Sequence, residues 1–99
     1  MKLIIAVVRP FLMDKLVVAF EHIENFPGIT VSESSSFEQR LLTSTTDALD
    51  PFKPNKRIEI AADDSMVDQI VTAIRENAHT GKNGDGIILV VPLESAYLI

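Results

Sequence analysis

The residues best suited to chemistry stand in one short stretch, Thr80-Gly81-Lys82-Asn83-Gly84-Asp85-Gly86. Glycine allows positive φ and close backbone approach, so successive N–H groups here could face one concavity and hold an anion such as phosphate. The alternative is structural: Gly81 ends a helix, and Asn83-Gly84 and Asp85-Gly86 are turn dipeptides. The order G-x-x-x-x-G-K-[ST] of a P-loop is absent. Spacing alone leaves both interpretations open.

The remaining polar residues do not indicate an enzyme or a metal site. His22 and His79 are the only histidines, one within a predicted helix and one at a helix end. Helix capping and loop solvation explain four further acidic residues better than a metal pair does: Asp47, Asp50, Asp63 and Asp64. No nucleophile stands beside a base, so we expect no catalysis.

Composition narrows the classes of partner. The chain has 99 residues, 46% of them hydrophobic, which is enough for one domain over residues 1–99 and too few for two. A net charge of −5 with no basic stripe disfavours nucleic acid. The absence of cysteine excludes disulfides and fits the cytoplasmic location that we expect. No apolar run approaches the roughly 20 residues of a membrane span, so we expect a protein that is not membrane-embedded.

Hydrophobic periodicity predicts the elements that position the glycine-rich stretch. Short apolar or alternating runs predict strands, and apolar residues at helical spacing predict two helices. The predicted strands are 3–8, 29–33, 56–61 and 87–91, and the helices are 12–26, ended by Pro27-Gly28, and one from about 65 to Gly81. This β-α-β-β-α-β order predicts an α+β, ferredoxin-like sandwich: a four-stranded antiparallel sheet with two helices on one face.

The first and last strands are apolar on both sides, although the helices can cover only one face. The first strand presents Leu3, Ile5 and Val7 to one side and Ile4, Ala6 and Val8 to the other, and alternate residues of 87–91 do the same. Leaving such side chains in water forgoes about 1.5–3 kcal/mol for each large one, so self-association is predicted. The alternative is a monomer covered by its own long loop and C-terminal tail.

A long loop of about 34–55 separates the two middle strands and shows no periodicity. Loops of this length in compact domains are usually functional or disordered. Four apolar residues in it have no obvious core to join and would suit docking on a partner protein: Leu41, Leu42, Leu49 and Phe52. The alternative is that they pack against the oligomer or have no partner.

Four segments together resemble the nitrogen-regulatory PII signalling proteins: Arg9-Pro10-Phe11 with Asp14, 28–33, 56–60 and the TGKNGDG stretch. The resemblance implies a homotrimer whose subunit clefts bind an adenine nucleotide and whose loop regulates a target transporter or enzyme. It assigns the adenine to Gly28, Ile29 and Thr30, with Ile60 and Ala61 across the cleft. It assigns the phosphates to the glycine-rich stretch: Thr80, Gly81, Lys82, Gly84, Asp85 and Gly86.

One departure from the family affects the choice of nucleotide. The family follows its GDG with a basic residue that grips phosphate, whereas Ile87 stands there in this chain. A charge-assisted contact contributes roughly 1.5–3 kcal/mol, so we expect ADP or AMP rather than ATP as the effector. The alternative function is a trimeric structural or interaction subunit that has lost nucleotide binding.

Overall fold

The structure is a computed structural model that describes residues 1–37, 51–82 and 85–99. Its elements follow the predicted order of strands and helices. They are β1 (Lys2–Val8), the 3-10 helix η1 (Pro10–Leu12), α1 (Met13–Glu21), β2 (Thr30–Ser36), β3 (Lys53–Ala62), the 3-10 helix η3 (Asp64–Met66), α3 (Val67–Ala78) and β4 (Gly86–Pro92). The α+β, ferredoxin-like prediction is confirmed.

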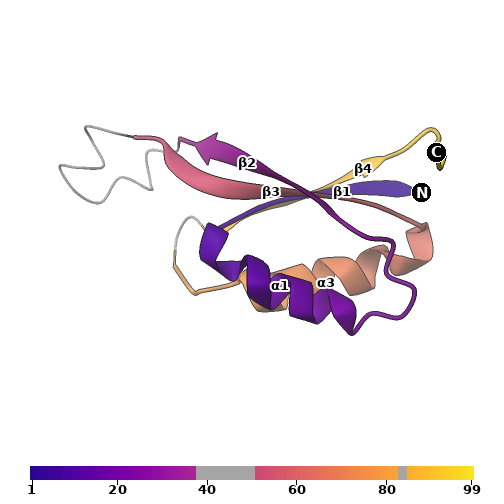
Figure 1. Ribbon diagram of the computed structural model, residues 1–99, viewed down its shortest axis with the longest axis horizontal. Coiled ribbons are helices and arrows are strands. Elements are labelled where there is room, and N and C mark those ends of the chain that lie inside the picture. Colours follow the sequence, from indigo (N-terminus) through magenta and orange to yellow (C-terminus); the bar gives the residue numbers. More distant parts are fainter. Residues whose placement is uncertain (38–50, 83–84) are drawn as a thin grey trace.

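The four strands form one antiparallel sheet in the order β2-β3-β1-β4. Both α-helices lie on the same face of this sheet, and no helix or strand of the described residues covers the other face (Figure 1). Val8, the last residue of the inner strand β1, pairs with Lys56 of β3 on one side and with Gly86 of β4 on the other. The end of β1 therefore lies beside the start of β4, where the glycine-rich stretch finishes.

The core lies between the sheet and the helices. Alternate residues of β1, namely Ile4, Ala6 and Val8, point toward the helices and are at most 2% exposed. They pack against buried side chains of the neighbouring strand and of both helices: Ile58, Ile60 and Ala62 from β3, Leu16 and Phe20 from α1, and Ile70 and Ile74 from α3. Burying such aliphatic side chains is the dominant favourable term in folding.

The first helix ends earlier than predicted. α1 stops at Glu21, not at the Pro27-Gly28 boundary. Backbone N–H groups of His22 and Ile23 bond three residues back instead of four, and Asn25 adopts a positive φ of 60°. The turn brings Phe26 onto Phe20, whose rings stack with centroids 4.7 Å apart. The helical spacing continued past Glu21 because Ile23 still points into the core, from a turn rather than a helix.

The middle strands extend into the segment predicted as the loop of about 34–55. Ser34 pairs with Asn55 and Ser36 with Lys53, so both ends of that segment belong to the sheet. Pro54 is tolerated there because β1 ends opposite Lys56, and nothing on that side needs the missing N–H. Figure 1 shows β2 and β3 continuing beyond the helices as a two-stranded arm.

The second helix has the predicted apolar stripe but ends earlier than predicted, at Ala78 with His79 as the C-cap residue, so the expectation that Gly81 ends the helix is wrong. α3 buries Ile70, Ile74 and Ala78 on the stripe expected from the sequence. Asp63 occupies the N-cap position of η3 but makes no side-chain capping hydrogen bond, so the capping role expected for it is wrong. In the described parts of the chain, no helix has the length and apolar content needed to cross a bilayer.

Candidate functional site

The glycine-rich stretch connects α3 to β4 and is organised around one carboxylate. Asp85 accepts hydrogen bonds from the backbone N–H groups of Thr80, at 2.8 Å, and Gly81, at 3.2 Å. The Thr80 hydroxyl donates to the same carboxylate and in turn accepts from the Lys82 N–H at 3.3 Å. Three successive backbone N–H groups are thus satisfied inside the stretch itself. We call residues 80–86 the Asp85 loop.

Two further cationic or polar groups reach Asp85 from outside the loop. Arg9 Nε, at the end of β1, lies 3.4 Å from one carboxylate oxygen, and His79 Nδ1, at the end of α3, lies 3.3 Å from the other. The Thr80 hydroxyl bond, followed by the two backbone bonds and the Arg9 charge, lowers the pKa of Asp85 against the opposing effect of burial. Asp85 is therefore an anion at neutral pH.

Backbone conformation and packing explain why glycine stands at two positions of the loop. Gly81 has a φ of 82°, and a Cβ there would meet nothing within 4 Å, so only its backbone conformation favours glycine. Gly86 has a φ of 134°, and a Cβ there would lie 2.0 Å from the carbonyl oxygen of Val7. Gly86 is thus needed for the close approach of β4 to β1. Gly84 lies outside the described residues.

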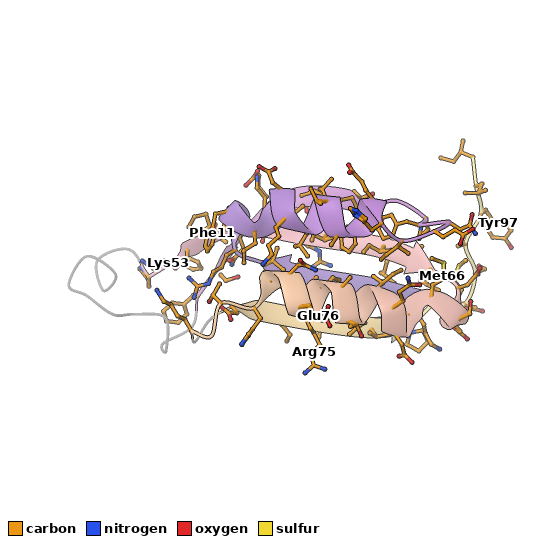
Figure 2. All side chains as sticks on the ribbon, turned by 90° about the horizontal axis from the view of Figure 1, so that it is seen from below. Phe11, Lys53, Met66, Arg75, Glu76 and Tyr97 are labelled. Atoms are coloured by element: carbon orange, nitrogen blue, oxygen red, sulfur yellow. The ribbon has the colours of Figure 1, made fainter. Side chains whose placement is uncertain are left out.

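A cavity of about 240 Å³ lies behind the loop, between the C-terminal end of α3 and the start of β4. Its walls are mostly apolar and include Val8, Ile74 and Ile88, while Arg75, His79 and Asp85 supply the polar groups. Figure 2 shows Arg75 extending outward from α3.

The predicted adenine residues come together at a different place. Thr30, the first residue of β2, pairs with Glu59, so the preceding Gly28 and Ile29 lie near the end of β3 that carries Ile60 and Ala61. Gly28, with a φ of 104°, and the half-buried Ile29 border a cavity of about 410 Å³ beside Phe20 and Phe26. The two segments that the resemblance paired are therefore neighbours.

One residue of that set cannot present its side chain to a ligand. Ile60 is 1% exposed and belongs to the core beneath the helices, so it can offer a ligand only its backbone. Ala61 and Thr30 are exposed on the uncovered face of the sheet, because successive residues of a strand point to opposite faces. Ala61 also pairs with Leu3 of that face.

The residues predicted for adenine lie away from the Asp85 loop on the sheet. Ala61 is paired with Leu3, five residue steps along β1 from Val8, the partner of Gly86. Five steps along a strand correspond to roughly 17 Å. Thr30 is nearer along the strands, because its partner Glu59 lies opposite Ile5, but it stands on β2, the edge strand on the other side of the sheet from β4. The single ribose that joins adenine to phosphate is shorter than either span.

The uncovered face carries the apolar surface that the sequence predicted. Its exposed members are Ile87, Leu89 and Val91 of β4, which are 54%, 43% and 40% exposed. Beside them, Leu3, Ile5 and Val7 of β1 complete what we call the open-face patch. Toward β2 the same face turns polar, with Thr30, Ser32 and Arg57.

The base of the long loop carries an aromatic pair. Phe37 and Phe52 follow and precede the paired ends of β2 and β3, with ring centroids 5.9 Å apart, and each is more than half exposed. Of the four residues predicted to dock on a partner, Phe52 is in this pair. Leu41, Leu42 and Leu49 lie outside the described residues.

The sequence did not point to three residues that take part in these contacts: Phe37 in the aromatic pair, and Arg9 and His79 beside Asp85. Arg9 directly follows Val8, and Asp85 directly precedes Gly86, the partner of Val8, so their contact depends on a register that the sequence does not supply. His79 is next to the loop and carries no spacing signal. Across residues 1–37, 51–82 and 85–99, no group of three acidic or histidine side chains could hold a metal ion.

Comparison with known proteins bears on the whole chain. The family profile described as nitrogen regulatory protein P-II matches residues 1–99. Proteins named "Nitrogen regulatory protein P-II" from Azospirillum brasilense and Bradyrhizobium diazoefficiens are each 35% identical to it, and one from Rhodospirillum rubrum is 34% identical. Each alignment covers 100% of this chain and 91% of the relative. The chain belongs to the nitrogen regulatory protein P-II family, whose proteins are regulators.

Proposed function

We propose that this protein is a homotrimeric signal-transduction protein that binds a small anionic effector, ADP or AMP, in clefts between its subunits. The effector controls how the segment of about 34–55 engages a partner protein, a transporter or an enzyme. The protein acts by binding and not by catalysis, and it works in the cytoplasm.

The observation that carries the proposal is the separation of the two halves of the site. Of the adenine residues, Ala61 lies roughly 17 Å from Gly86 along the strands. Thr30, with Gly28 and Ile29 before it, stands at the opposite edge of the sheet from β4. A mononucleotide can touch both only where one end of a subunit meets the opposite end of a neighbour. Such a head-to-tail contact is heterologous, and it closes into a ring when the rotation permits.

The open-face patch provides the driving force for that assembly. It places the apolar strands β1 and β4 next to the polar strip that carries Thr30 and Ala61. Burying the patch against neighbours brings the start of β4 of one subunit near the polar strip of the next. Assembly and site formation would then be one event, as expected of a sensor whose clefts are built from two subunits.

The identity of the effector follows from charge. The exposed Ile87 is the second residue of β4 and stands where a basic residue would grip a terminal phosphate. Of the loop's groups, the backbone N–H groups of Thr80, Gly81 and Lys82 already have partners inside the loop. The exposed Lys82 ammonium is the cationic side chain left to meet phosphate in the described part of the loop. This favours AMP or ADP over ATP.

Calorimetry combined with subunit mixing tests the proposal. The wild type should release or absorb heat with ADP or AMP. Ala61→Trp blocks the adenine half and Lys82→Glu blocks the phosphate half, so each variant alone should fail to bind. After the two variants are unfolded and refolded together, mixed trimers should recover binding, because one cleft in each combines the intact halves.

Two results would count against the proposal. If the wild type gives no heat with AMP, ADP or ATP, nucleotide binding is excluded. If the wild type binds but the mixture does not recover, the site lies within one subunit. Light scattering on every sample provides the control that both variants remain trimeric.

A second candidate function is a trimeric structural or interaction subunit without an effector. Ile87 and the internally satisfied N–H groups of the loop favour it. This candidate predicts a stable trimer that gives no heat with any nucleotide. It also predicts that Lys82→Glu leaves partner binding unchanged, whereas a sensor would lose its effector-dependent regulation.

A further inference from the structure

The Asp85 carboxylate is already engaged by its own chain. Three groups donate hydrogen bonds to it: the N–H groups of Thr80 and Gly81 and the Thr80 hydroxyl. Arg9 Nε and His79 Nδ1 lie 3.4 and 3.3 Å from its oxygens. An ionised carboxylate offers about four lone-pair directions. With three of them used and a side chain only 19% exposed, Asp85 has little room for a ligand.

The groups around Asp85 come from three different elements. Thr80 and Gly81 belong to the loop, Arg9 follows β1, and His79 ends α3. Gly86, the next residue, is fixed against the Val7 carbonyl and so anchors the carboxylate to the sheet. Asp85 therefore ties the start of the loop to its end and to two neighbouring elements.

From this arrangement we infer that Asp85 is a positioning residue. It holds the Asp85 loop closed by occupying the Thr80 and Gly81 N–H groups, which consequently do not bind the effector. This inference rests on the proposed function for the location of the effector, and it changes how the loop works. The protein's own carboxylate takes the place in the first part of the loop that a ligand phosphate would otherwise fill.

Displacement of Asp85 by a ligand phosphate is the opposite possibility. It would leave Arg9 and His79 to find new partners and would expel a carboxylate held by charge-assisted bonds, which are about twice as strong as neutral ones. A phosphate bound without displacing Asp85 would meet a negative charge at contact distance. The effector is therefore expected to meet the exposed Lys82 side chain and not the N–H groups of Thr80 and Gly81.

The test compares Asp85→Asn, Thr80→Val and Thr80→Ser with the wild type. Glu76→Gln is the matched control, since it also turns an acid into its amide, on the outer surface of α3 (Figure 2). The readouts are ADP affinity by calorimetry, the NMR shifts and hydrogen exchange of the Thr80 and Gly81 amides, and the urea midpoint for global folding.

We expect Asp85→Asn and Thr80→Val each to weaken ADP binding about tenfold, the equivalent of one hydrogen bond to a charged group. Thr80→Ser, which keeps the hydroxyl, should retain wild-type affinity. The double variant should be no weaker than either single one, because both remove the same interaction. In the wild type, saturating ADP should leave the shifts of the Thr80 and Gly81 amides unchanged.

Tighter ADP binding by Asp85→Asn, together with large ADP-induced shifts at Thr80 and Gly81, would overturn the inference, since Asp85 would then compete with the ligand. If the wild type binds no nucleotide, the proposed function fails but the inference is still tested without ligand. Exchange of the Thr80 and Gly81 amides must then be faster in Asp85→Asn than in Glu76→Gln at equal urea midpoints. Equal exchange rates would overturn it.

Discussion

Leu89→Asp should convert the proposed trimer into a monomer without unfolding it. Leu89 lies in the middle of β4 on the uncovered face, between Ile87 and Val91, and pairs with Ile5 of β1. None of these three β4 residues belongs to the core beneath the helices. An aspartate at position 89 can stay hydrated in a monomer but not inside an interface.

The magnitude follows from the area that remains exposed. Full burial of a large aliphatic side chain contributes about 1.5–3 kcal/mol. Scaled by the exposed fractions of Ile87, Leu89 and Val91, which are 54%, 43% and 40%, the gain on association is roughly 2–4 kcal/mol per subunit. An unpaired carboxylate in the interface costs several kcal/mol, so the substitution outweighs the whole contribution of these three side chains.

Sedimentation equilibrium measures the effect directly. The wild type should run as a trimer at micromolar concentration and Leu89→Asp as a monomer. Val18→Asp is the matched control, because Val18 is 53% exposed but lies on α1, in the other layer of the molecule. That variant should remain trimeric.

If Leu89→Asp stays trimeric, or if Val18→Asp dissociates equally, the open-face patch does not drive assembly. A monomeric wild type would contradict the prediction as well and would favour the alternative of a monomer whose patch is covered by its own loop and tail. Circular dichroism separates dissociation from unfolding, since the helices do not contact Leu89.

Two further predictions concern the Asp85 loop. Gly86→Ala should lower the free energy of unfolding by about 3 kcal/mol or more, because its Cβ would lie 2.0 Å from a β1 carbonyl. Gly81→Ala, strained only by its φ of 82°, should lose about 1–2 kcal/mol in the same urea titration, and a reversed order would contradict the packing. The pKa of Asp85 is lower in the folded state than its ordinary value of 3.8, so the unfolded state takes up the proton first. The stability that Asp85 contributes is complete above about pH 5 and is lost as the pH falls through the lower folded-state pKa. As the pH is lowered from neutral, the free energy of unfolding measured with urea should fall less in Asp85→Asn than in the wild type. An identical fall in the two proteins would disprove the contribution.

The order and type of the elements could be predicted from the sequence because periodicity reports which side of each element is apolar. The stripe Ile70, Ile74 and Ala78 of α3 is buried as expected. Periodicity misleads where an apolar residue of a turn points into the core. Ile23 is such a residue, and the first helix was therefore predicted to extend to Phe26 although it ends at Glu21. Likewise, polar residues that pair only through their backbones, such as Ser34 and Ser36, gave no strand signal.

The chemistry of the glycine-rich stretch was decided by the tertiary structure. The sequence determined that residues 80–86 allow unusual backbone conformations and that one face of the sheet is apolar and uncovered. It could not show that Asp85 accepts hydrogen bonds from the Thr80 and Gly81 N–H groups, or that the residues predicted for adenine lie elsewhere on the sheet. The first depends on the conformation of a loop held between α3 and β4. The second depends on strand register, which places Gly86 beside Val8 and Ala61 beside Leu3. Register is set by packing between segments far apart in the chain, and local sequence does not contain it.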